Sequence, residues 1–276
     1  MHLESVGWLV PLVALLAAGL FAGFCAGMFG IGGGFVVVPA LLLVLPLIGG
    51  EKGEFAHVAV GTSAATIIVA SLRSVTAHAK RGAVDFEILK SWAPWLILGD
   101  TGGVVLANYI DGHGLLLIFA IGVMLMSIMF IVPRLSEHVI SDQMPSGATR
   151  VAIAGGLGAF SSLLGIGGGT IAITVMTLCS RTIHKAIATA SGIGTLIAIP
   201  TTIGFAIIGF YKHGLPWGSL GYINVPAAIA ISSMSILTAP LGVAAAHRLP
   251  AAPLKRIFGA YLVIISLFMF KNALKM

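Results

Sequence analysis

The pentapeptide GIGGG occurs twice in this chain, at residues 30–34 and 165–169. Glycine costs about 1 kcal/mol relative to alanine in a helix interior, so each GIGGG predicts a helix break. A helix that restarts after the break presents free N–H groups and the positive end of its dipole, which attract anions. The pattern predicts a small-anion site formed by the residues at the two restarts: Gly32, Gly33, Gly34, Phe35, Gly167, Gly168, Gly169 and Thr170.

Two alternative roles for the glycines compete with an anion site. Glycines also allow helices to pack closely, and a single copy would favour that packing role. Two copies, each at a predicted helix break, favour the anion site instead. A phosphate-binding loop is excluded, because neither copy is followed by Lys-Ser or Lys-Thr.

Hydroxyl groups supply a second set of candidate ligands. Thr62 and Ser63 lie in the small-residue run AVGTS at 59–63, and the counterpart run ATASG at 188–192 contains Ser191. Such hydroxyls either donate to the oxygens of an anion or bond back to their own helix. The sequence leaves both roles open.

Four ionisable residues are candidates for coupling or gating: Asp100, Arg73, His57 and His184. Asp100 is the one acid well inside an apolar segment, where a carboxylate either carries protons or bonds structurally to Thr101 or to the backbone. Arg73 lies near a segment end and is expected to reach outward from it rather than to hold a ligand. The two histidines occupy related places ahead of the segments that carry the hydroxyls.

No catalytic or metal-binding set can be assembled from the sequence. The histidines show no ligand-like spacing, and Cys25 and Cys179 lie far apart in apolar segments. An intramembrane enzyme would need a nucleophile or paired acids at depth, and Asp100 stands alone. We therefore expect no catalytic residue, no metal and no cofactor, and we expect that the protein is not an enzyme.

The segments that position these residues are unusually apolar. The 276 residues are 58% hydrophobic and 9% charged, with a mean hydropathy of +1.07, whereas soluble domains are roughly 25% charged. Apolar segments that approach the length of a membrane span lie at 7–29, 31–48, 56–78, 92–110, 113–132, 150–165, 166–180, 186–210, 221–247 and 254–270. The predicted fold class is an all-α polytopic membrane protein with about 8–10 transmembrane segments.

Repeated motifs divide the chain into two halves. Besides GIGGG, Lys80-Arg81-Gly82 recurs as Lys212-His213-Gly214, and Ile118-Phe119 recurs as Ile257-Phe258, in the same order. We predict a first membrane repeat at 1–132, a polar cytoplasmic linker at 133–149 and a second repeat at 150–276. An odd number of segments in each half would make them inverted repeats, with the two glycine breaks facing each other near the midplane. Whether each GIGGG joins two full spans or forms a re-entrant hairpin is left open.

The basic residues predict the orientation in the membrane. Ten crossings place eleven Lys and Arg residues on one side and four on the other, so the first side is expected to be cytoplasmic and both termini periplasmic. The first segment lacks a basic flank and is expected to be retained as a span rather than removed as a signal peptide. The net charge of +6 is scattered over short loops, which indicates a lipid bilayer as partner and no nucleic acid.

The chain resembles the TauE/SafE family of sulfite-exporter membrane permeases. The resemblance is carried by the paired GIGGG segments, the AVGTS run, KRGAVDF at 80–86, LPWGSLGYIN at 215–224 and APLG at 239–242. It implies a transporter in the bacterial inner membrane for small sulfur anions such as sulfite or organosulfonates like sulfoacetate. It also implies that the glycine motifs and Thr62-Ser63 form the binding site.

The chain departs from the family pattern in two places, and rival functions stay open. The second AVGTS-like run is replaced here by Ala190-Ser191-Gly192, and the role of Asp100 is not implied by the resemblance. An exporter working by alternating access is the first hypothesis. The alternative is an anion channel, or a permease for another small organic anion. Transport direction, coupling ion and homo-oligomer formation stay open.

Overall fold

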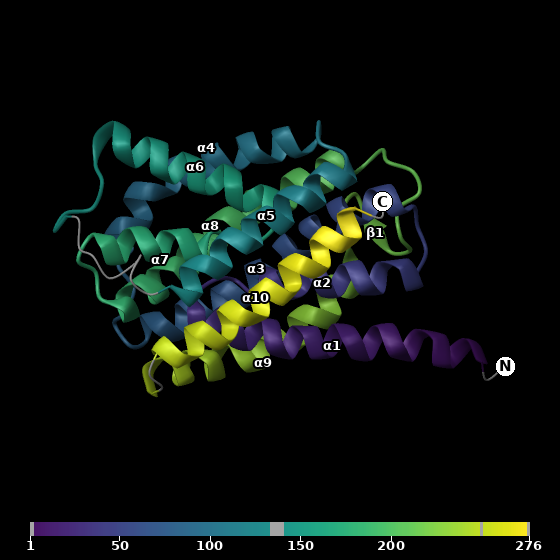
Figure 1. The fold of residues 1–276 in the computed structure, drawn as a ribbon, viewed down its shortest axis with the longest axis horizontal. Helices are drawn as coiled ribbons and strands as arrows, with labels where there is room; N and C mark the ends of the chain where they lie inside the picture. Colours follow the sequence, from purple (N-terminus) through teal and green to yellow (C-terminus); the bar gives the residue numbers. More distant parts are fainter. Residues whose placement is uncertain (1–2, 133–140, 249–250, 275–276) are drawn as a thin grey trace.

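The computed structural model describes residues 3–132, 141–248 and 251–274 (Figure 1). The helices run in chain order as α1 Leu3–Phe29, α2 Gly34–Val44, η1 Leu45–Leu47, η2 Lys52–Glu54, α3 Phe55–Ala79, α4 Phe86–Ala107, α5 Gly112–Ile131, α6 Gly147–Leu164, α7 Gly169–Leu178, α8 Ile183–Ile208, α9 Val225–Arg248 and α10 Ala251–Ala273. A two-residue antiparallel pair, β1 Ser219–Leu220 with β2 Ile223–Asn224, precedes α9. Residues 133–140 of the predicted linker lie outside the described residues.

The prediction of an all-α polytopic membrane protein is confirmed. Seven of the described helices are long and apolar enough to cross a membrane, namely α1, α3, α5, α6, α8, α9 and α10. The 22-residue helix α4 is also long, but it is more polar because Glu87, Lys90 and Asp100 lie along it. The outer faces of the bundle expose many large apolar side chains, among them Leu98 and Ile229, as expected where lipid is the solvent.

The two helices that follow the glycine motifs are short. The apolar stretches Gly34–Leu47 and Gly169–Leu178 span about 21 Å and about 15 Å at 1.5 Å per residue, against a hydrocarbon thickness of about 30 Å. Neither can cross a bilayer alone, so the structure favours broken helices over full spans at the GIGGG segments. Figure 1 shows α2 and α7 toward opposite ends of the bundle.

Two parallel helix pairs pack closely at their glycines. Cβ atoms added at Gly19, Gly23 and Gly27 of α1 would overlap the backbone of α9 at Ile231, Ser235 and Ala239 in turn, so these helices run parallel. The same relation joins α4 and α6, where Gly99 meets Gly155 and Gly103 meets Ala159. Small residues let membrane helices approach closely, which compensates for the weak hydrophobic drive between helices in lipid.

Two antiparallel pairs complete the bundle. On α3 and α8, Gly61 lies against Phe205 and Ser71 against Gly194, while Ser74 and Ser191 share a hydrogen bond of 2.9 Å. On α5 and α10, Ser266 donates to the carbonyl oxygen of Ala120 at 2.8 Å. Both glycine loops pack against residues of α3 and α8.

The α1–α9 contact can be tested with one methyl group. Gly27→Ala is expected to lower the thermal unfolding temperature of the detergent-solubilised protein, because the new Cβ would overlap the Ala239 carbonyl. Overpacking of this kind costs about 1–3 kcal/mol. The matched control is Gly102→Ala on α4, where a Cβ meets nothing within 4 Å. Equal unfolding temperatures for the two variants would contradict the close backbone contact between α1 and α9.

Candidate anion-binding site

Both glycine motifs fold into loops that other residues could not form without strain. The φ angles are 67°, 77° and 83° at Gly30, Gly32 and Gly33, and 61°, 71° and 67° at the second-loop equivalents Gly165, Gly167 and Gly168. These values lie in the left-handed region, which glycine alone adopts readily. The repeated sequence therefore specifies a repeated backbone.

The two loops lie directly against each other. A Cβ at Gly34 would overlap the carbonyl oxygen of Gly165, and a Cβ at Gly169 would overlap the carbonyl oxygen of Gly30. The contact is crosswise, since the end of each loop meets the start of the other. The structure thus brings together the two motifs that the sequence separates by more than a hundred residues.

Each loop ends at the N-terminus of a short helix. Gly33 is the N-cap of α2, and Gly168 is the N-cap of α7. Among the described residues, no side chain accepts a hydrogen bond from the first N–H groups of either helix. Their free N–H groups and positive dipole ends are therefore available to an anion. Phe35 contributes backbone only, because its side chain is fully buried near Phe258.

The predicted hydroxyls lie beside the loops, and each already has a partner. Ser63 Oγ donates to the Gly165 carbonyl at 2.8 Å, and Thr62 Oγ1 accepts from the Asn224 amide at 2.8 Å. Ser191 bonds to Ser74 of α3. Ser191 also bonds back to its own helix, at the Ile187 carbonyl. Ser63 bonds to another segment, whereas Thr62 accepts and keeps its own hydrogen to donate. The role of these hydroxyls as anion ligands stays a prediction.

Three other hydroxyls near the loops have no partner. Ser71, Ser161 and Thr170 are buried, and within the described part of the chain their hydroxyl oxygens make no hydrogen bond. Ser71 Oγ lies beside Gly194, which in turn lies near the Gly167 carbonyl, whereas Ser161 Oγ lies beside Gly168. An unsatisfied buried hydroxyl is costly, so these groups are free to bind a ligand.

Sequence reasoning singled out Thr170 but missed Ser71 and Ser161. One signal was available for Ser71: Ser63, Ser71 and Ser74 fall on one face of α3 at helical spacing. No comparable sequence pattern points to Ser161. Its hydroxyl is a candidate ligand only because the fold places it beside Gly168 of the second loop.

Asp100 is fully buried between α4 and α8. Its Oδ1 lies 2.5 Å from Thr201 Oγ1, while its Oδ2 has no hydrogen-bond partner among the described residues. Thr201 also bonds to the Ile197 carbonyl at 3.0 Å, and Ile197 lies against Gly168. Asp100 is therefore one helical turn of α8 away from the second glycine loop.

The remaining predicted residues are not brought to the glycine loops. Arg73 is exposed and lines a hollow of about 430 Å³ together with Lys80 and Arg81. His184 is exposed and stacks on His247 with ring centroids 5.2 Å apart. His57 is buried at the start of α3, and His184 lies at the start of α8. Because α3 and α8 are antiparallel, these two histidines mark opposite ends of the bundle.

All ten residues of the two loops are buried. The loops are therefore shielded from solvent in this conformation, and the neighbouring Thr170 lines a hollow of only about 30 Å³. A multi-pass helical bundle with two facing helix breaks at its centre is an architecture of secondary transporters.

Comparison with known proteins agrees with that class. The model of the family described as "Sulfite exporter TauE/SafE" matches residues 15–269. A Haemophilus influenzae protein named "Probable membrane transporter protein" is 31% identical over 257 residues, covering 92% of this chain and 96% of its own. A similarly named protein of Methanocaldococcus jannaschii is 26% identical over 270 residues, covering 95% and 96%. No solved structure matches the chain.

The chain belongs to the sulfite exporter TauE/SafE family. It is a multi-pass membrane transporter of that family, as the resemblance of its motifs implied.

The loop geometry predicts which substitutions block transport. Gly33→Val and Gly168→Val are expected to abolish transport in proteoliposomes, because both positions have positive φ and a Cβ would press on Ala22 or Leu157. Gly156→Val is the control, since Gly156 is exposed on α6 with nothing within 4 Å. All three variants should elute as folded protein in size-exclusion chromatography. Transport by both loop variants at the wild-type rate would remove the loops from the site.

Proposed function

We propose that this protein is a secondary transporter that exports small sulfur-containing anions, such as sulfite or organosulfonates like sulfoacetate, by alternating access. The observation that carries the proposal is the crosswise contact of two glycine loops, each opening a short uncapped helix. Two helix N-termini at one place favour a negatively charged ligand. The family description, "Sulfite exporter TauE/SafE", supports sulfur chemistry for that ligand.

Hydrogen-bond donors around the loops support a small oxyanion. Ser71, Ser161 and Thr170 offer three free hydroxyls beside the helix ends, and a sulfite or sulfonate group has three oxygens to accept them. Among the described residues no Lys or Arg side chain is buried. Helix dipoles and hydroxyls would therefore balance the charge of the anion, and its release would not require breaking a buried ion pair.

Helix pairing supports two inverted repeats, at 1–132 and 150–276, joined by the linker at 133–149. Exchanging the halves replaces α1 by α6 and α4 by α9, so the parallel pair α1–α9 becomes the parallel pair α6–α4. The α3–α8 and α5–α10 pairs exchange into themselves. Such symmetry is expected when the two halves rock against each other around a fixed midplane site.

The burial of the loops supports alternating access over an open channel. Hollows of about 600 Å³ and about 430 Å³ lie near His57 and Arg73, at the two opposite ends of the bundle. Neither is lined by a glycine of the two motifs. A substrate would reach the site only after one half moves relative to the other.

Clustered basic residues support the proposed orientation in a bacterial inner membrane. Lys80 and Arg81 follow the end of α3, Lys185 lies at the start of α8, and Arg248 ends α9. Contacts such as the one between Arg81 and the Val243 carbonyl place these helix ends together. The positive-inside rule assigns that end to the cytoplasm and the N-terminus to the periplasm.

The substrate class is tested with purified wild-type protein. Sulfite, thiosulfate, sulfoacetate, taurine, sulfate and carboxylate analogues are compared by thermal shift, then by uptake into proteoliposomes. We expect stabilisation by sulfur oxyanions or sulfonates and saturable, coupled uptake. Currents linear in voltage would indicate the anion channel instead. The absence of a response to every sulfur anion would overturn the substrate class.

The free hydroxyls are tested by removing them singly. Ser161→Ala and Thr170→Val are expected to weaken anion binding about 10- to 100-fold, because a hydrogen bond to a charged group contributes about 1.5–3 kcal/mol. Thr177→Val on the same helix is the control, since its hydroxyl is already bonded to the Ile173 carbonyl at 3.0 Å. Isothermal titration calorimetry measures the dissociation constants, and equal values for all three variants would argue against these ligands.

A further inference from the structure

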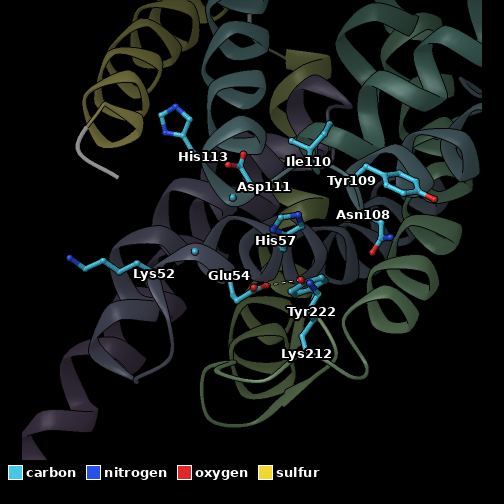
Figure 2. Close-up of a pocket in the computed structure, with 12 residues that line it drawn as sticks. Lys52, Glu54, His57, Asn108, Tyr109, Ile110, Asp111, His113, Lys212 and Tyr222 are labelled. Carbon is cyan, nitrogen blue, oxygen red and sulfur yellow. Dashed lines mark hydrogen bonds between the residues drawn. The ribbon is translucent and has the colours of Figure 1, made fainter.

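A cavity of about 600 Å³ opens at the end of the bundle where α3 and α5 begin and α4 ends. Figure 2 shows the side chains around it, with His57 in their midst. Ser63, which bonds to the second glycine loop, lies about 9 Å from His57 along α3, at 1.5 Å per residue. The cavity therefore lies nearer to the end of the bundle than the proposed central site does.

His57 is held in one orientation in this cavity. Its Nε2 lies 3.2 Å from the Ala107 carbonyl oxygen, and its ring stacks on Tyr222 with centroids 4.9 Å apart and planes at 25°. A carbonyl oxygen only accepts hydrogen bonds, so the ring hydrogen of neutral His57 must be on Nε2. Nδ1 then carries a lone pair; it is buried and makes no hydrogen bond within the described residues, and the Ile110 backbone lies close to the ring.

The charged residues on the cavity wall are equal in number for each sign, although the Lys52 side chain points away from His57 (Figure 2). Lys52 and Lys212 are opposed by Glu54 and Asp111, with His113 as the other titratable imidazole. Both carboxylates are already engaged: Glu54 accepts from Tyr222 at 2.6 Å, and Asp111 accepts from the Gly114 amide at 2.8 Å. Burial and Glu54 raise the pKa of Tyr222 above its ordinary value, which keeps that phenol a donor. The net charge of the cavity wall therefore depends on whether His57 and His113 are protonated.

A proton and an anion would favour each other at this place. His57 is only 5% exposed, so a charged imidazolium alone there is unfavourable. An anion in the cavity offsets that cost through its charge; Nδ1 is itself buried from solvent, so the coupling is electrostatic and not a direct hydrogen bond. By linkage, each ligand must then increase the affinity for the other.

We propose that the cavity is a second, outer anion site in which a small sulfonate or sulfur oxyanion binds together with one proton on His57 Nδ1. This inference rests on the proposed function and adds proton coupling to it. The proton comes from water or buffer on the side to which the cavity opens, forms the Nδ1–H bond, and returns there when the anion leaves. The Lys212 ammonium and the Asn108 amide are further donors on the cavity wall.

The test counts protons with sulfoacetate as the probe, because both of its acidic groups stay ionised near neutral pH. Titration calorimetry in two buffers of different ionisation enthalpy should give uptake of about one proton per anion at about pH 7.5. The dissociation constant should rise about tenfold from pH 7 to pH 8. His57→Gln should abolish the proton uptake and flatten this pH dependence, whereas the control His213→Gln, an exposed histidine outside the cavity wall, should retain both.

Two further measurements keep the outcome decisive. Lys212→Gln, an exposed change at the rim, should weaken binding and keep the proton count, which tests the site even if His57→Gln does not fold. Gly33→Val, which blocks the central site, should still bind sulfoacetate with proton uptake. Binding by wild-type protein without proton uptake, or uptake retained in His57→Gln, would overturn the outer site alone. The absence of sulfur-anion binding by wild-type protein would overturn the proposed function and this inference with it.

Discussion

A helix that breaks inside a membrane must find partners for its freed backbone groups, and the rest of this structure depends on how that is done. The two glycine loops pack directly on each other: the end of each lies against a carbonyl at the start of the other. Ser63 adds a hydrogen bond to the Gly165 carbonyl. Side chains larger than hydrogen would prevent this approach, so the glycines are a packing requirement as well as a conformational one.

The same constraint explains the chemistry that the site can offer. Two helix starts without capping side chains lie close together, and their first N–H groups are left without side-chain partners. Charge recognition then comes from dipoles and hydroxyls, so no ammonium or guanidinium group has to be buried in lipid. Ionisable groups lie farther out, with His57 at one end of the α3–α8 pair and His184 at the other. The proposed proton site and the proposed central anion site therefore lie at different depths.

Much of the fold follows from local properties of the chain. Hydropathy predicts the long helices, and the glycines predict the two breaks, because each depends on residues within one segment. The lengths of α2 and α7 were harder to predict, since an apolar run shows where a segment is buried but not how much of it is helical. Of the predicted pair Thr62 and Ser63, Ser63 contacts the second glycine loop. Their hydroxyls, however, bond to Asn224 and Gly165, which no local pattern indicates.

The sequence by itself determined the membrane class, the positions of the helix breaks, the backbone that GIGGG must adopt and the family. Only the tertiary structure decided that the two loops touch, that Ser71 and Ser161 are the free hydroxyls, and that His57 faces a cavity with one nitrogen unpaired among the described residues. The physical reason is the range of the interactions. Helix formation and membrane burial act over a few residues, whereas the partner of a buried polar atom is chosen by packing between segments far apart in the chain.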